Sequence, residues 1–285
     1  MREPEQGWAV VVPVKGGPLA KSRLHLPRAN RAELADAFAR DTVAALAAGM
    51  PGMPVLVVTS DPDVTHWVLA AGHAVVADPG SGLDGAVAAG VVTARAGGAS
   101  RVAVVLGDHP ALRPAEVRAA LVAAGEHPAS VVADADDDGT ALLTLTPGAA
   151  AGGVRTAFGP GSAAAHERLG HHRLDLDLPG LRVDVDDSAA LAVATRLGLG
   201  PCSRAALAHA SLPGVQATIH RIEPDGSGAA LLDDGREVTV PAGAAVASGL
   251  RHLRVGQRVS VELDETGRAA TRVWVVGIGP GEDIH

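Results

Sequence analysis

The stretch WAVVVPVKGGPLAKSRL (Trp8–Leu24) decides the fold, because an apolar run passes there directly into a loop with three basic residues. Trp8–Val14 has the length and composition of a buried strand, and the glycines and proline that follow end it. The bare amides of such a loop can approach an anion, and Lys15, Lys21 and Arg23 suit a polyphosphate. The loop lacks the glycine that precedes the lysine in a Walker motif, and by itself it is equally compatible with a solvated surface loop.

Composition sets the bounds on what the protein can be. The chain has 285 residues, 47% of them apolar, which is enough for about two folded domains. A net charge of −8 argues against a general polyanion binder, and a single cysteine, Cys202, excludes an internal disulfide and a cysteine-based metal cage. No apolar run approaches the length of a membrane span and the first residues do not resemble a signal peptide, so we expect a cytoplasmic protein without membrane contact.

Short apolar runs alternate with alanine-rich helical patterns over the first 130 residues. The expected strands are Trp8–Val14, Pro54–Thr59, His73–Ala77 and Arg101–Leu106, and the clearest helices between them are Arg31–Ala48 and Gly82–Ala96. This alternation predicts an α/β fold with a mostly parallel sheet and helices on both faces. Ligands of such sheets bind beyond the carboxyl ends of the strands.

The pattern changes twice further along the chain. SVVADADDDGTALLTL and HRLDLDLPGLRVDVDD are typical of hairpin strands, with a short helix Ser162–Leu169 between them and helices Asp187–Leu197 and Ser203–Ala210 after them. Beyond Pro213, short strands with Asp-Gly and Thr-Gly turns predict a small all-β barrel. We therefore expect two domains, 1–211 and 212–285.

Three aspartates are candidates for a metal site. Asp108 directly follows the run RVAVVLG, and Asp184 and Asp186 in RVDVDD are two apart on an expected strand, so their side chains share one face. An exposed strand end is the simpler explanation of the pair. Together with a phosphate-type loop, however, the three carboxylates form an oxygen-rich set that suits Mg²⁺ shared with substrate phosphates.

The loops between these segments supply further candidates. Gly82 and Leu83 in DPGSGLDGA can contact a nucleotide base or ribose, although a plain strand-to-helix connection fits equally well. Thr140, Gly159 and Ser162 can seat a small anionic acceptor near a helix start, or Ser162 is simply the helix cap. His166, His171 and His172 match no zinc motif, and we expect them at the surface or behind a site.

These segments together resemble a known family. VPVK, AKSRL, DPGSGLDGA, LGDHPAL, GTALL, FGPGS and RVDVDD occur in the order seen in the 2-phospho-L-lactate or phosphoenolpyruvate guanylyltransferases, which build the deazaflavin coenzyme F-420. The resemblance spans about residues 8 to 200. It implies a nucleotidyltransferase-like, Rossmann-like fold and attack by the phosphate of a three-carbon phosphoacid on the α-phosphate of GTP, with release of pyrophosphate.

The resemblance also implies roles for individual residues. Its Mg²⁺ ligands correspond to Asp108, Asp184 and Asp186, and its phosphoenolpyruvate contacts to Thr140, Gly159 and Ser162. Lys15, Lys21 and Arg23 correspond to the catalytic triphosphate clamp, with Gly82 and Leu83 beside the nucleotide. The implied partners are GTP, a small phosphoacid and an enzyme further along the F-420 pathway.

Two other functions remain compatible with the sequence. A related nucleotidyltransferase acting on a sugar phosphate or a molybdopterin-type acceptor would share the loop and the metal site. The segment from Gly214 to about Val276 is similar to a cold-shock or OB barrel, so an RNA-associated regulatory protein is the alternative from another class. Its middle strands carry no aromatic residue for base stacking, and we expect weak or no nucleic-acid binding.

Overall fold

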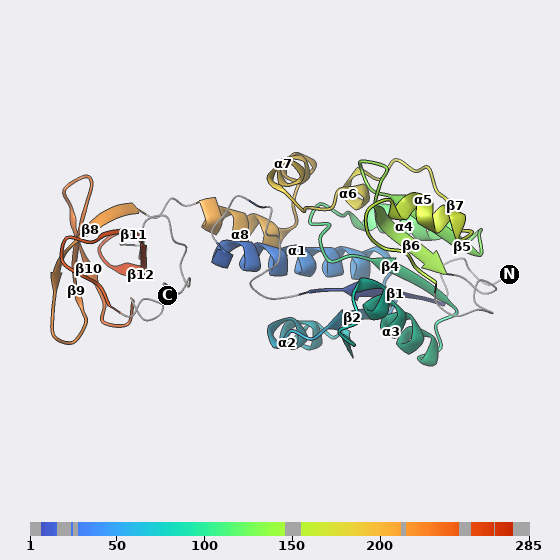
Figure 1. The fold of residues 1–285 in the computed structure, drawn as a ribbon, viewed down its shortest axis with the longest axis horizontal. Helices are drawn as coiled ribbons and strands as arrows, with labels where there is room; N and C mark the ends of the chain where they lie inside the picture. Colours follow the sequence, from blue (N-terminus) through green and yellow to red (C-terminus); the bar gives the residue numbers. More distant parts are fainter. Residues whose placement is uncertain are drawn as a thin grey trace. The chain divides into compact units, whose positions relative to one another are not determined.

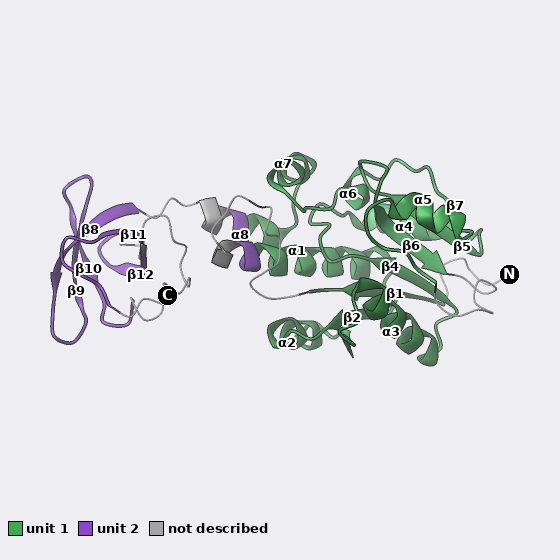
Figure 2. Cartoon of the chain, viewed as in Figure 1, with its two compact units in different colours: residues 1–24, 34–205 green, residues 25–33, 206–285 purple. Residues whose placement is uncertain are grey.

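The computed structural model describes residues 7–15, 24, 28–145, 155–211, 215–244, 252–264 and 266–275. The chain divides into two compact units, residues 1–24 with 34–205 and residues 25–33 with 206–285 (Figure 2). The first unit contains a seven-stranded sheet and the second a five-stranded sheet (Figure 1). No helix in the described part of the chain is both long and apolar enough to cross a membrane.

The larger sheet is mostly parallel, as the sequence predicts. Its strands are β1 (Trp8–Pro13), β2 (Val55–Thr59), β3 (Ala74–Ala77), β4 (Arg101–Val105), β5 (Ala129–Ala133), β6 (Thr140–Leu145) and β7 (His172–Arg173). Their order is β3-β2-β1-β4-β6-β5-β7, in which β6 alone runs antiparallel to its neighbours. Because β1 lies at the centre of the parallel part, its end is flanked by the ends of β2 and β4.

Helices cover both faces of this sheet. Alternate residues of β1 belong to two separate apolar clusters, Val10 and Val12 to one and Ala9 and Val11 to the other. The first cluster includes residues of α1 (Arg28–Gly49), α2 (Pro62–Ala70) and α4 (Pro114–Ala124), and the second includes residues of α3 (Leu83–Ala96). Helix α3 packs closely because it carries Gly90 against Val11, where a Cβ would clash.

The region after β4 positions most of the candidate site. Strands β5 and β6 form the expected antiparallel hairpin, and α5 (Ser162–Arg168) follows. The prediction of a second hairpin over HRLDLDLPGLRVDVDD is wrong. Only β7 is a strand there, it pairs in parallel with β5, and a one-turn helix α6 (Pro179–Arg182) starts at the proline. Helices α7 (Ser188–Leu197) and α8 (Pro201–Ser211) complete the order.

The second unit contains an antiparallel sheet with its own core. Its strands are β8 (Val215–Ile222), β9 (Gly228–Leu232), β10 (Glu237–Val240), β11 (Arg258–Leu263) and β12 (Ala270–Val275), in the order β10-β9-β8-β11-β12. The apolar cluster of this unit consists of valine, alanine, leucine and isoleucine residues, and alternation is clear in β8, where Ala217 and Ile219 are buried, and in β10, where Val238 and Val240 are buried. One parallel bridge joins Thr239 of β10 to Ala269, next to β12. The outermost strands of the sheet therefore meet at this point.

Candidate active site

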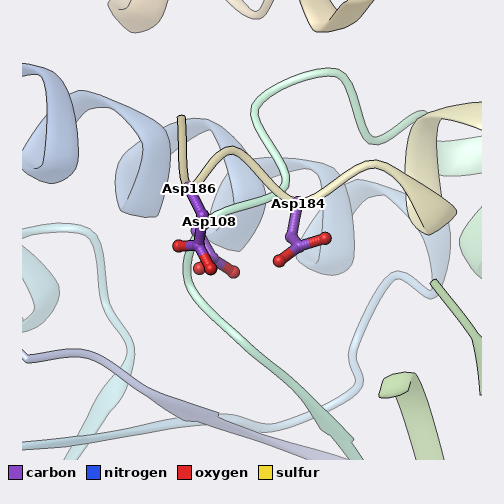
Figure 3. Close-up of side chains that lie close together, drawn as sticks. All are labelled: Asp108, Asp184 and Asp186. Carbon is purple, nitrogen blue, oxygen red and sulfur yellow. The ribbon is translucent and has the colours of Figure 1, made fainter. Parts of the chain in front are cut away.

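The three candidate aspartates lie together. One carboxylate oxygen from each of Asp108, Asp184 and Asp186 lies within 4.8 Å of the others (Figure 3). Asp108 follows β4, whereas Asp184 and Asp186 come from the segment between α6 and α7. The amide of Val185 donates to the carbonyl of Asp108 at 2.9 Å, so a main-chain hydrogen bond joins the two segments where the carboxylates meet.

The expected strand around Asp184 and Asp186 does not form, yet the predicted alternation holds. Residues 183–185 have no strand partner and are held instead by the bond from Val185 to Asp108. Val183 and Val185 are buried, and Val183 is extended. Because side chains alternate in an extended segment, the two aspartates share the opposite side from these valines.

The electrostatics of this cluster favour a bound cation. The pKa of Asp184 is raised from its usual value to about 7, first by burial and then by the charges of Asp108 and Asp186. Three carboxylates this close repel one another unless a proton or a metal ion lies among them. An all-oxygen, acidic donor set of this kind fits Mg²⁺ in preference to a softer metal.

Part of the basic loop can be placed. Lys15 is exposed and lies two residues beyond β1, where the amide of Val14 donates to Val58 at the end of β2. It is thus at the carboxyl edge of the sheet. Lys21 and Arg23 lie outside the described residues.

The glycine loop before α3 has the backbone that its sequence requires. Gly82 precedes the helix with φ +87°, a conformation that favours glycine, and Leu83 opens the helix with 37% of its surface exposed. The next residue, Asp84, accepts hydrogen bonds from the Thr156 hydroxyl at 2.6 Å and from the Phe158 amide at 3.1 Å. The loop expected to contact the nucleotide is therefore tied to the segment that leads into Gly159 and Ser162.

Thr140 and Ser162 are neighbours in the fold. Their hydroxyls are 2.9 Å apart, and the Thr140 hydroxyl is also 2.9 Å from Nδ1 of His166. Both hydroxyls are buried, while Gly159 is exposed in the turn that precedes them. The cap of α5 is Gly161, in the left-handed region, so Ser162 is not the helix cap.

The loop between β5 and β6 is braced from three directions. The Asp134 carboxylate accepts from the amides of Asp136, Asp138 and Gly139, and this folds the loop back on itself. The Asp138 carboxylate accepts from the Gly161 amide at 3.0 Å. From α6, Arg182 donates to the carbonyls of residues 133 and 134 and to the Asp137 carboxylate. The loop that carries Thr140 is thereby fastened both to α5 and to the segment that carries Asp184.

Comparison with known proteins identifies the family. The model of the MobA-like NTP transferase domain matches residues 31–175. A phosphoenolpyruvate guanylyltransferase of Salinispora arenicola is 48% identical over 201 residues, covering 69% of this chain and 91% of its own. Another, from Sanguibacter keddieii, is 43% identical over 235 residues, covering 68% of this chain and 82% of its own. The chain belongs to the phosphoenolpyruvate guanylyltransferase family. It is a nucleotidyltransferase.

A further member of this family and one solved structure complete the comparison. The phosphoenolpyruvate guanylyltransferase of Streptomyces scabiei is 42% identical over 216 residues, which cover 73% of this chain and 99% of its own length. A protein of Desulfovibrio desulfuricans, described as a nucleotide-diphospho-sugar transferase, superimposes with a TM-score of 0.55 over 71% of this chain and 94% of its own at 20% identity. That likeness supports the α/β nucleotidyltransferase fold alone.

Sequence reasoning missed several residues around the family's expected site. The histidines were expected at the surface or behind a site: His172 is exposed, whereas His166 and His171 are buried and His166 bonds to Thr140 from behind. Asp134, Asp138 and Arg182 brace the loop between β5 and β6, although only the Asp-rich run DADDDG signalled a tight turn there. No local pattern connects Arg182 to residues almost fifty positions earlier.

Proposed function

We propose that the protein transfers GMP from GTP to phosphoenolpyruvate, or to the related 2-phospho-L-lactate, and releases pyrophosphate. The observation that carries this proposal is the meeting of Asp108, Asp184 and Asp186 at the carboxyl edge of a nucleotidyltransferase sheet, in a chain up to 48% identical to phosphoenolpyruvate guanylyltransferases. A second support is the braced group of Thr140, Gly159 and Ser162 on the neighbouring strand and helix. The product belongs to the biosynthesis of coenzyme F-420, and the reaction takes place in the cytoplasm.

The reaction depends on positioning the two substrates more than on transferring a proton. An oxygen of the acceptor phosphate attacks the α-phosphorus of GTP, and the bond from that phosphorus to the bridging oxygen of the β-phosphate breaks. The acceptor oxygen is already ionised, so no base has to remove a proton. The protein therefore has to hold two highly charged molecules in line against their mutual repulsion.

We assign the roles as follows. Asp108, Asp184 and Asp186 hold Mg²⁺, which supplies positive charge to the α-phosphate region and the acceptor when bound. Lys15, Lys21 and Arg23 clamp the triphosphate and stabilise the departing pyrophosphate. Gly82 and Leu83 contact the nucleoside. Thr140, Gly159 and Ser162 seat the phosphoacid.

We assign residues 1–211 to catalysis and residues 212–285 to an OB-type barrel that recruits a partner, such as the next enzyme of the pathway. The strand order and the parallel bridge at Thr239 support this topology. Residues 212–285 contain ten acidic residues against seven arginines, and three of these arginines, Arg221, Arg236 and Arg258, pair with neighbouring carboxylates, so this segment offers no excess of positive charge to a phosphate backbone. The full chain should therefore leave the anisotropy of a labelled single-stranded RNA unchanged at physiological salt; tight binding would contradict the assignment.

Pyrophosphate release tests the reaction directly. The purified protein is incubated with Mg²⁺, GTP and one phosphoacid at a time: phosphoenolpyruvate, 2-phospho-L-lactate or 3-phosphoglycerate. The guanylated product is identified by mass spectrometry. ATP in place of GTP and glucose 1-phosphate in place of the phosphoacid are the controls. We expect turnover with GTP and phosphoenolpyruvate. Turnover only with the sugar phosphate would replace the acceptor assignment, and no turnover with any pair would end the proposal.

A further inference from the structure

The hydrogen bonds that link Ala157, His166 and Thr140 have a defined direction. They lie behind Thr140 and Ser162, which are proposed to bind the phosphoacid. The main-chain amide of Ala157 donates to Nε2 of His166 at 3.0 Å. An amide can only donate, so Nε2 carries no proton, and the neutral ring carries its proton on Nδ1. Nδ1 lies 2.9 Å from the Thr140 hydroxyl and therefore donates to it.

Counting protons shows what this direction leaves for a ligand. The Thr140 and Ser162 hydroxyls hold two protons, and the 2.9 Å bond between them uses one. Because His166 donates, neither proton goes to the ring, and the pair keeps one O–H to give. With the opposite tautomer, that proton would be bound to the imidazole. A group that offers a hydrogen-bond donor suits the anionic oxygen of a phosphoacid.

His166 also joins three segments that surround the acceptor group. It lies on α5, and its Nδ1 is hydrogen-bonded to Thr140 at the start of β6. Its Nε2 accepts a hydrogen bond from the segment that leads to Phe158 and Gly159. The ring is fully buried and packs edge-on against Phe158 and His171. Among the described residues, no atom lies within 4 Å of where a Cβ would stand on Gly159 or Gly161, so space is open beside the turn that His166 helps to hold.

We propose that His166 is a positioning residue for the acceptor: as a neutral Nδ1–H tautomer it orients the Thr140–Ser162 hydroxyl pair to donate to an anionic oxygen and fixes the Gly159–Gly161 turn beside it. This inference rests on the proposed function, because it takes Thr140, Gly159 and Ser162 as the acceptor seat. A purely structural role would make any loss of His166 equally harmful to both substrates.

Two substitutions of similar size separate these roles. In His166→Asn the side-chain amide occupies roughly the place of Nδ1 and keeps the bond to Thr140. In His166→Gln it reaches roughly the place of Nε2 and keeps the bond from Ala157 but loses Thr140. Each variant gives up one buried hydrogen bond, so their unfolding temperatures should fall by similar amounts.

The test is steady-state kinetics of the full-length variants with Mg²⁺, GTP and phosphoenolpyruvate. We expect His166→Gln to raise the KM for phosphoenolpyruvate about tenfold, the usual effect of losing a hydrogen bond to a charged ligand, with the KM for GTP within about twofold of wild type. His166→Asn keeps the bond to Thr140 and loses only the bond from Ala157, so it should raise the KM for phosphoenolpyruvate clearly less than His166→Gln does, by about threefold at most, with the KM for GTP unchanged. Equal changes in the two variants, or a parallel rise in the KM for GTP, would overturn the positioning role.

A second measurement keeps this result separate from the proposed function. If the wild-type protein turns over none of the phosphoacids, the proposed function fails, and the histidine is examined by imidazole ¹⁵N NMR of the full-length protein with Mg²⁺. We expect His166 to show a protonated Nδ1 and an unprotonated Nε2, and added phosphoenolpyruvate to shift the Nδ1 resonance. The opposite tautomer, or a resonance that phosphoenolpyruvate leaves unmoved, would refute the inference even if the enzyme is active.

Discussion

At the scale of single residues, Asp184 is expected to serve the proposed metal site while lowering the stability of the metal-free fold. Its pKa of about 7 results mainly from burial, and the charges of Asp108 and Asp186 add to it. In the unfolded chain an aspartate titrates near 3.9. Because the folded pKa is the higher one, the contribution of Asp184 is most favourable at acidic pH and is lost as the pH rises from about 4 to 7. Above pH 7 the site therefore has an unfavourable charge that a cation can neutralise.

Asp184→Asn should accordingly stabilise the metal-free protein while abolishing guanylyl transfer. We expect the free energy of unfolding at pH 8 to rise by about 2 kcal/mol, after allowance for solvent screening of the partly buried group. Mg²⁺ should raise the unfolding temperature of the wild type and have little effect on the variant. Thermal unfolding with and without Mg²⁺ measures both effects. Asp63→Asn, which removes an exposed charge on α2, is the control, and equal stabilisation by the two changes would contradict the prediction.

His166 gives a pH dependence of the opposite sign. Its pKa is lowered to about 4, first by burial and second by His171, while Asp84 and the Ser162 carbonyl act against this shift. As the pH falls below about 6.5, the unfolded chain takes up a proton at this histidine that the folded protein does not. Stability is therefore lost as the pH falls from about 6.5 to 4.

Comparison with His166→Asn isolates this contribution, because other titrating groups are common to both proteins. Between pH 7 and pH 5 the wild type should lose about 2 kcal/mol more of its unfolding free energy than the variant does. Equilibrium urea unfolding at the two pH values measures the difference. An identical pH dependence in the two proteins would show that His166 is readily protonated in the fold.

At the scale of elements, the sequence predicted what periodicity encodes and missed what depends on distant partners. The parallel strands and the helices α1 and α3 follow from short apolar runs and alanine-rich patterns, and both were predicted to within a few residues. The alternation in RVDVDD brought Asp184 and Asp186 to one side even though no strand forms there. The brace from Arg182 to the β5–β6 loop could not be predicted, since nothing local marks which guanidinium reaches which carbonyl.

The contacts of Arg182 with the β5–β6 loop lead to a separate prediction. Arg182 lies two residues before Asp184, and its guanidinium holds the loop that precedes Thr140. Arg182→Gln should therefore loosen both the proposed phosphoacid site and the aspartate cluster. We expect the KM for phosphoenolpyruvate and the Mg²⁺ concentration for half-maximal rate to rise about tenfold each, by loss of several charge-assisted hydrogen bonds. Both are read from initial rates of pyrophosphate release.

Arg173→Gln is the matched control for this experiment. Arg173 also pairs with Asp137, but its other partners are the exposed carboxylates of Glu167 and Asp175, and it contacts neither carbonyl of the loop. Surface pairs of this kind contribute little, so both kinetic constants should stay within about twofold of wild type. A comparable loss in the two variants would assign the effect to Asp137 and not to the brace.

At the scale of the whole molecule, the relatives match only part of this chain. The relative from Streptomyces scabiei is covered over 99% of its length by 73% of this chain, so about a quarter of this chain has no counterpart there. The family model lies within residues 31–175, and the three aspartates belong to the first unit. Guanylyl transfer should therefore not depend on the second unit.

A chain that ends after Ser211 tests this directly. We expect it to fold cooperatively and to retain kcat and both KM values within about threefold of the full-length protein, since the apolar clusters of the larger sheet lie before that point. Circular dichroism shows whether the shortened chain is folded, and pyrophosphate release gives the kinetics. A folded but inactive product would assign the second unit a direct part in the reaction.

The short outer strands of the larger sheet bear on how the protein behaves in crowded solution. One edge is the four-residue β3 and the other is the two-residue β7. A sheet grows into fibrils by adding strands to a long, flat border, and these borders present few unpaired amides and carbonyls. Light scattering should therefore show the native protein remaining dispersed at concentrations and storage times that would cause a sheet with longer edges to aggregate.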